Sequence, residues 1–257
     1  MVNNLSKSWF FCEKKNLTEL LGKDIVFGQL CLQFQYLSDN LILLSSYNNP
    51  HLPKKFSSQK KKIIPLKDNG IELRPDLYSG FVVFRNKDKL YIPPSQIFSG
   101  YLMVPAKLSV YKSGTGLLFS GYSEYTSKTW IGANLGKGYA TTVLKNCLGI
   151  ESSERMPEHI IVLPVSIENK SDQDIPIDKF NVNFDYVTLY RDKKRLLATG
   201  IKIIYSDQDK SEEIEYLSFS RNLADSAVVI RKAKSVPEAD FVKRTFELVG
   251  KIKGDND

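Results

Sequence analysis

The sequence predicts an all-β protein with two antiparallel β-sandwich-like lobes. Apolar and polar residues alternate in short runs over residues 159–205, and clusters of turn-forming residues separate the runs. Helical periodicity is scarce elsewhere in the chain. Short strands with Gly, Asn and Pro between them are typical of sandwiches and barrels, not of βαβ units.

The most regular stretch predicts two strands joined by a turn. The apolar positions of its first strand are Ile161, Leu163, Val165 and Ile167. A polar turn follows at residues 169–174. The apolar positions of the second strand are Phe180, Val182, Phe184 and Tyr186. This period of two predicts one buried and one polar face for each strand.

Near the N-terminus, residues 17–21 predict one helical turn that ends at Gly22. Residues 30–36 alternate as a strand with one wet face, whereas Ile25 and Phe27 carry the opposite parity. Gly28 stands where the parity changes. We therefore expect a β-bulge or bend at Gly28.

The remaining elements follow the same pattern. The other predicted strands are residues 41–44, 81–84, 90–92, 104–110, 117–119, 129–131, 139–143, 201–205, 215–219 and 227–231. Pro93 and Pro94 end the strand at 90–92. Residues 235–249 fit a short C-terminal helix, although a strand is also compatible with them, and residues 251–257 predict a frayed tail.

Composition predicts a domain boundary near residues 100–105. Residues 1–104 hold 14 Lys and Arg against 8 Asp and Glu, whereas the charges of residues 105–257 nearly balance. We expect an N-terminal β lobe over residues 1–104 and a C-terminal sandwich over residues 105–257. One continuous sandwich is the alternative.

A lysine-rich segment over residues 50–67 is the chief electrostatic signal. Its lysines are Lys54, Lys55, Lys60, Lys61, Lys62 and Lys67, with no acidic residue among them. Pro53 and Pro65 disfavour regular structure, so we expect a mobile, exposed loop. Such a loop is either a hydrated linker or a possible anion-binding site for nucleic acid or an anionic membrane surface.

The sequence contains no signature of catalysis. G-x-S-x-G, H-E-x-x-H and C-x-x-C are all absent, and the chain has two histidines and three cysteines. We therefore expect no enzyme activity, no cofactor and no metal site. The early apolar run, residues 9–12, is too short for a signal peptide or a transmembrane segment, which predicts a cytoplasmic protein.

Four aromatic residues flank a glycine-rich segment at residues 132–138. They are Tyr122, Tyr125, Trp130 and Tyr139. Together they form a possible aromatic platform for sugar rings or unpaired bases. Core packing is the alternative, and on that interpretation Trp130 lies inside the second lobe. The glycine-rich segment itself fits a hairpin connection better than a phosphate-binding loop.

Short motifs in the second half carry a resemblance to a known family. Lys-Thr-Trp-Ile-Gly at residues 128–132, Lys-Gly-Tyr at 137–139 and Leu-Pro-Val-Ser-Ile-Glu-Asn at 163–169 resemble an uncharacterised β-rich family of archaea and some bacteria. That family has no assigned activity or site residues. The Val-x-Ile-x-Asn run also resembles strands of immunoglobulin-like domains, which implies a sandwich architecture without their Cys…Trp…Cys hallmark.

These observations predict a non-catalytic protein-binding or adaptor module. Exposed sheet edges recruit strands from other chains, and β-sandwiches serve as interaction scaffolds. The identity of such a protein partner is not specified by the sequence. Two alternatives stay open: a binder of nucleic acid or an anionic surface through the lysine-rich loop, and a carbohydrate-binding module that uses the aromatic residues.

Overall fold

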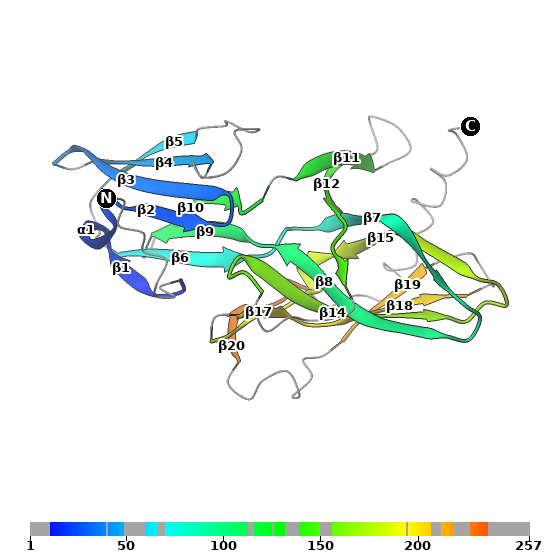
Figure 1. Cartoon of the computed structure of the whole chain (residues 1–257). Coiled ribbons are helices and arrows are strands. Elements are labelled where there is room, and N and C mark those ends of the chain that lie inside the picture. The colour runs from blue at the N-terminus through cyan, green and yellow to red at the C-terminus, as the bar shows by residue number, and fades with distance from the viewer. Residues whose placement is uncertain are drawn as a thin grey trace. The chain divides into compact units, whose positions relative to one another are not determined.

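The computed structural model shows a protein built almost entirely of β-strands, which confirms the predicted fold class (Figure 1). Strands dominate the chain because β-branched and aromatic residues alternate with polar ones, so each strand buries one face. The structure describes residues 11–39, 41–48, 60–65, 70–112, 116–124, 126–131, 139–149, 156–193, 195–206, 212–217 and 227–235. The predicted C-terminal helix and the frayed tail lie outside these residues, except for Ser235.

The chain forms two compact units, each of which contains several chain segments. Unit 1 consists of Met1–Leu77, Pro105–Tyr125 and Pro157–His159. Unit 2 consists of Tyr78–Val104, Thr126–Met156 and Ile160–Asp257. The boundary expected near residues 100–105 falls at one of the points where the chain passes between the units. Residues 78–104 lie in unit 2 and residues 105–125 in unit 1, because strands of unit 1 pair with partners distant in sequence.

Unit 1 contains two four-stranded sheets. The first has the order β1 (Lys14–Asn16), β6 (Gly70–Asp76), β9 (Lys107–Lys112), β10 (Gly116–Tyr122). The second has the order β2 (Asp24–Phe27), β3 (Leu30–Ser38), β4 (Leu41–Asn48), β5 (Lys60–Pro65). Helix α1 (Leu17–Leu20) is the predicted helical turn, and it is followed by Gly22 at a φ of 68°. Leu17 and Leu20 are buried, so both apolar ends of this turn pack into the core.

The parity change at Gly28 has a different cause from the predicted bulge. β2 and β3 form an antiparallel hairpin in which Phe27 pairs with Leu30. Gly28 has a φ of 63° at the first position of the two-residue turn, as a type II′ hairpin requires. Paired residues project to the same face, so Phe27 and Leu30 both reach the core despite their different parity. The break at Gly28 is confirmed, and its assignment as a bulge is wrong.

Unit 2 contains a four-stranded and an eight-stranded sheet. The four-stranded sheet has the order β11 (Ser127–Ile131), β12 (Tyr139–Lys145), β7 (Phe81–Ile92), β15 (Ile175–Asn183). The eight-stranded sheet runs from β13 (Leu148–Gly149) through β8 (Ile97–Pro105), β14 (Ile160–Asn169), β17 (Arg195–Ala198) and β16 (Leu189–Asp192) to β20 (Val228–Arg231). β18 (Ile201–Tyr205) also pairs with β14, and β19 (Glu212–Tyr216) pairs with β18.

The sheets are mainly antiparallel, but they include parallel pairs that the sequence did not predict. β12 pairs in parallel with β7, and β14 does so with both β17 and β18. β14 is buried where predicted, at Ile161, Leu163, Val165 and Ile167. The strand predicted through Tyr186 is shorter, because the chain turns into the 3-10 helix η1 (Phe184–Tyr186), where the Asn183 side chain accepts a hydrogen bond from the Asp185 N–H.

A buried asparagine joins the two sheets of unit 2. Asn169, at the end of β14, is fully buried at the start of the predicted turn. Its Nδ2 donates to the carbonyl oxygens of Ile92 on β7, at 2.8 Å, and Gln173, at 2.7 Å. Its Oδ1 accepts from the N–H and the hydroxyl of Ser171, at 2.8 and 2.7 Å. Both donor and both acceptor positions of the side-chain amide thus have partners within the protein, as a buried amide requires.

Candidate functional site

The longest strand of unit 2, β7, is interrupted midway by an irregularity. The pairs Ile177 with Leu90 and Lys179 with Arg85 are successive in its ladder with β15. Asp178 alone therefore stands opposite the four β7 residues 86–89. An irregularity of this size, which we call the β7 bulge, leaves part of the β7 backbone outside the ladder and redirects its side chains. It also explains why the sequence showed two strands, at 81–84 and 90–92, where the structure has one.

Asn146 holds the backbone of this bulge from the end of β12. Its N–H donates to the Arg85 carbonyl oxygen at 2.9 Å, and its side-chain oxygen accepts from the Lys87 N–H at 2.8 Å. Asn146 has a φ of 54°, a left-handed conformation that Asn adopts more readily than most residues. The two bonds satisfy backbone groups on either side of Asn86.

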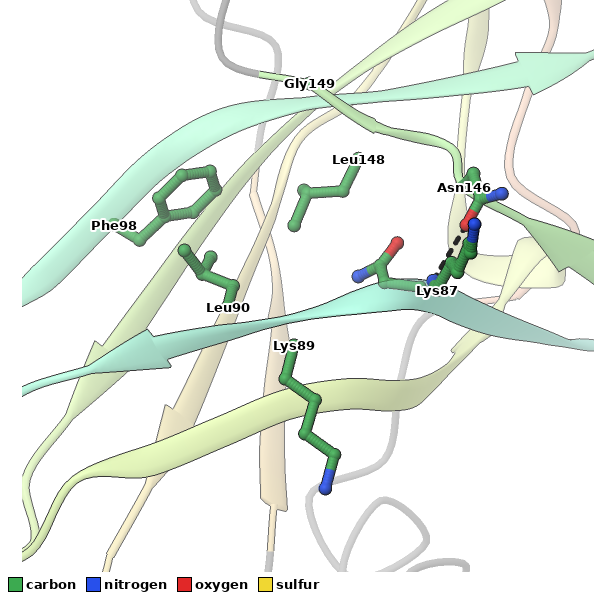
Figure 2. Close-up of a pocket in the computed structure, with 8 residues that line it drawn as sticks. Lys87, Lys89, Leu90, Phe98, Asn146, Leu148 and Gly149 are labelled. Atoms are coloured by element: carbon green, nitrogen blue, oxygen red, sulfur yellow. Dashed lines mark hydrogen bonds between the residues drawn. The ribbon is translucent and has the colours of Figure 1, made fainter.

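A cavity of about 450 Å³ opens beside the bulge. Its lining consists of Asn86, Lys87, Lys89, Leu90, Phe98, Asn146, Leu148 and Gly149. In Figure 2 the apolar side chains of Leu90, Phe98 and Leu148 project into the same space, whereas Lys89 extends away from it. The Asn86 Nδ2 is buried and has no hydrogen-bond partner among the described residues. An apolar cavity of this size with a few polar groups fits a small molecule or part of a larger one.

A row of cations crosses the same sheet at the start of the bulge. Arg85 on β7 pairs with Lys145 on β12 and with Lys179 on β15. Residues paired in this way project to one face with their Cα atoms about 4.5–5.5 Å apart. Three basic residues thus stand at one level on three adjacent strands. Like charges placed directly opposite one another destabilise a sheet.

Two further lysines continue the basic residues along β7 beside the cavity. Lys87 and Lys89 are exposed on β7, and both lysines line the cavity. Arg85 on β7 and Lys145 on β12 are also exposed. We call this set the basic face of unit 2, and it consists of Arg85, Lys87, Lys89, Lys145 and Lys179. Asp88 and Asp178 are the acidic residues of the same bulge. Cations are in excess, so the face would attract an anion.

The lysines singled out in the sequence occupy a different place. Lys60, Lys61 and Lys62 lie on β5, an edge strand of unit 1, so the predicted loop is wrong for residues 60–65. A strand forms here because Ile64 is buried in the core. Lys62 Nζ donates to the Leu118 carbonyl oxygen at 2.6 Å. Lysines on an edge strand discourage pairing with other chains. Lys54, Lys55 and Lys67 lie outside the described residues.

The predicted aromatic platform is described only in part. Tyr122 lies on β10 of unit 1 with 40% of its surface exposed. Trp130 and Tyr139 lie on the paired strands β11 and β12 of unit 2, but their side chains are outside the described part, as is Tyr125. The predicted burial of Trp130 therefore stays a prediction, and so does carbohydrate binding. The antiparallel pairing of β11 with β12 confirms that residues 132–138 connect a hairpin.

Neither metal-binding clusters nor membrane-spanning helices occur in the described part of the chain. Its His, Cys, Asp and Glu residues form no group of three or more that could hold a metal ion. None of its helices is long and apolar enough to cross a membrane. His159 makes its polar contact with a single carboxylate, at 3.1 Å between Nε2 and Glu124 Oε1.

The sequence did not predict the basic face, because its residues are far apart along the chain. Lys145 and Lys179 are distant from Arg85 in the sequence, and only strand register places them beside it. The one local signal was the alternation of Arg85, Lys87 and Lys89. That signal is weak by itself, since basic residues on alternate positions are ordinary on a solvated strand face.

Comparison with known proteins yields one family. Residues 17–250 match the family model described as "Protein of unknown function (DUF432)". No curated protein and no solved structure matches the chain. The match spans most of both units and agrees with the resemblance to an uncharacterised family.

Proposed function

The chain belongs to the DUF432 family, and we propose that it is a binding protein whose basic face takes a phosphate-bearing polyanion. The observation that carries this proposal is the register of Lys145, Arg85 and Lys179 across three adjacent strands. A like-charged row destabilises the unliganded sheet, and a multiply charged anion above the row would turn this repulsion into attraction. The proposed anion site thus lies on unit 2 and not on the lysine-rich loop.

Arg85→Glu tests the proposal, because binding and stability should respond in opposite directions. A glutamate between Lys145 and Lys179 has two cross-strand neighbours of opposite charge where Arg85 has two of like charge, so the free energy of unfolding should stay constant or rise by about 0.2–1 kcal/mol. The same change removes a cation from the phosphate site. Since a hydrogen bond to a charged group contributes roughly 1.5–3 kcal/mol, affinity should fall about ten- to hundredfold.

The probe is a fluorescein-labelled abasic deoxyribose-phosphate oligomer of about 12 units, a length typical of single-strand binders. Binding is followed by fluorescence anisotropy at low salt. For the unmodified protein, the logarithm of affinity should fall with the logarithm of salt by roughly 0.7 for each neutralised phosphate. Absence of binding by the unmodified protein at low salt would refute the proposal.

Lys61→Glu provides the matched control. Lys61 is also exposed on a strand, and its pairing partner Ser45 is uncharged. The charge change equals that of Arg85→Glu, so both variants alter the net charge of the protein equally. We expect Lys61→Glu to retain nearly full affinity. Loss of binding in Lys61→Glu but not in Arg85→Glu would place the anion site on the lysine-rich segment instead.

A protein partner is the second candidate, and β20 favours it. This strand ends its sheet in the described part of unit 2, with Val228 and Val229 exposed at 56% and 45%. An exposed apolar edge can accept a strand from another chain. Affinity purification from the native cell with the unmodified protein and with Val229→Lys tests this candidate. A partner retained equally by both proteins would argue against binding at β20.

A further inference from the structure

We infer that the polyanion is a single-stranded nucleic acid and that the cavity beside the β7 bulge receives one of its bases. This inference rests on the proposed function, since the same lysines serve both. Lys87 and Lys89 belong to the basic face and also line the cavity. A ligand that fills the cavity therefore has cations at its edge, where an attached phosphate would lie.

The lining of the cavity has the chemistry that a nucleobase requires. A base is flat and apolar on its faces and carries hydrogen-bonding groups on its edges. Leu90, Phe98 and Leu148 supply apolar contact, and Phe98 offers an aromatic ring for stacking. These groups fit a planar ring better than a branched, hydroxyl-rich sugar.

An unsatisfied amide specifies the polar part of the ligand. Asn86 lines the cavity, and its Nδ2 is buried and donates to no described residue. A buried donor without a partner is unfavourable, and an acceptor brought by a ligand would relieve this. Carbonyl oxygens and ring nitrogens of bases are such acceptors, and amide side chains recognise base edges in this way. Lipid chains offer no acceptor at that depth.

Only a single-stranded nucleic acid can place a base in the cavity and its phosphates over the basic face at the same time. In a duplex the bases are stacked and paired, so none is free to enter a cavity, whereas a single strand can turn one base out. The remaining phosphates would continue over Arg85, Lys145 and Lys179. Neighbouring strands of a sheet are about 4.8 Å apart, so this row presents cations at short, regular intervals.

The experiment compares two probes of equal charge, the abasic oligomer described above and a single-stranded oligonucleotide of the same length with mixed bases. The unmodified protein should bind the base-containing probe about 5- to 150-fold more tightly, which is the fold-change expected from one stacked base. Phe98→Ala should remove most of that difference and leave the affinity for the abasic oligomer unchanged. Arg85→Glu should weaken the binding of both probes.

Asn86→Ala is the second variant, because Phe98→Ala removes packing from β8. The Asn86 Nδ2 has no described hydrogen-bond partner to lose, so the fold should tolerate this truncation. We expect Asn86→Ala to lower affinity for the base-containing probe and to spare the abasic one.

Each outcome separates this inference from the proposed function. Equal affinity for the two probes, with both dependent on Arg85, would overturn base recognition and leave polyanion binding intact. Equal or tighter binding of a duplex of the same length would also overturn it. Binding to anionic phosphatidylserine vesicles without binding to either oligomer would overturn the inference and indicate that the ligand is a membrane surface. No binding to any probe would refute both proposals.

Discussion

Replacing Asn169 by alanine should strongly destabilise unit 2. This buried side chain makes four hydrogen bonds, two donated and two accepted, between 2.7 and 2.8 Å. Alanine would leave the Ile92 carbonyl oxygen and the Ser171 N–H buried without these partners. Each orphaned group costs about 1–3 kcal/mol. Ser171 keeps its hydroxyl bond to the Gln173 carbonyl oxygen, at 3.0 Å, so only two groups lose their partner and we expect a total loss of about 2–6 kcal/mol.

Unfolding in urea, followed by tryptophan fluorescence, measures this loss. The chain has two tryptophans, Trp9 in unit 1 and Trp130 in unit 2. In a Trp9→Phe background the fluorescence comes from Trp130 alone, so the observed unfolding transition is that of unit 2. Gln173→Ala is the control, since it changes an exposed side chain in the same turn and should stay within about 0.5 kcal/mol of the parent. A loss below about 1 kcal/mol for Asn169→Ala would refute the assigned role of this network.

Two other tests of the fold concern a pair of glycines and a half-buried carboxylate. A Cβ on Gly28 would lie 2.5 Å from the Ser123 carbonyl oxygen at a φ of 63°, whereas one on Gly22 meets nothing within 4 Å at a φ of 68°. Gly22→Ala should therefore cost about 1–2 kcal/mol from backbone strain alone and Gly28→Ala about 2–5 kcal/mol, and equal losses in urea unfolding would contradict this account. Burial of the Asp185 carboxyl raises its pKa, but hydrogen bonds from Lys234 and the Gly80 backbone, with the charges of Lys234 and Arg231, together outweigh burial, so the pKa is lowered in the folded protein. Its ionised form stabilises unit 2 above the unfolded pKa of about 3.9, and that contribution is lost as the pH falls through the lower folded value. Asp185→Asn should flatten this acid-side dependence, and an unchanged pH profile of urea unfolding would contradict the prediction.

The sequence by itself determined the all-β class and many strand positions. Local alternation decides these features, since a period of two in side-chain burial is a property of each strand alone. Residues 161–167 lie in β14 with the predicted inward face, and the turn predicted at residues 17–21 is α1 over Leu17–Leu20. The errors at Gly28 and after Asn183 have one origin. Alternation shows that the face changes or ends, but it does not distinguish a bulge, a hairpin turn and a 3-10 turn.

Tertiary structure alone decided the pairing of strands, and with it the candidate site. The five residues of the basic face come from three separate strands, and neither charge counts nor motif spacing relate Lys145 to Arg85. The lysine-rich segment is recognisable in the sequence because its lysines are close together, yet its described lysines occupy an edge strand of unit 1. A run of charge is visible along a chain, whereas a row of charge across a sheet depends on register, and register is set by long-range packing of the buried faces.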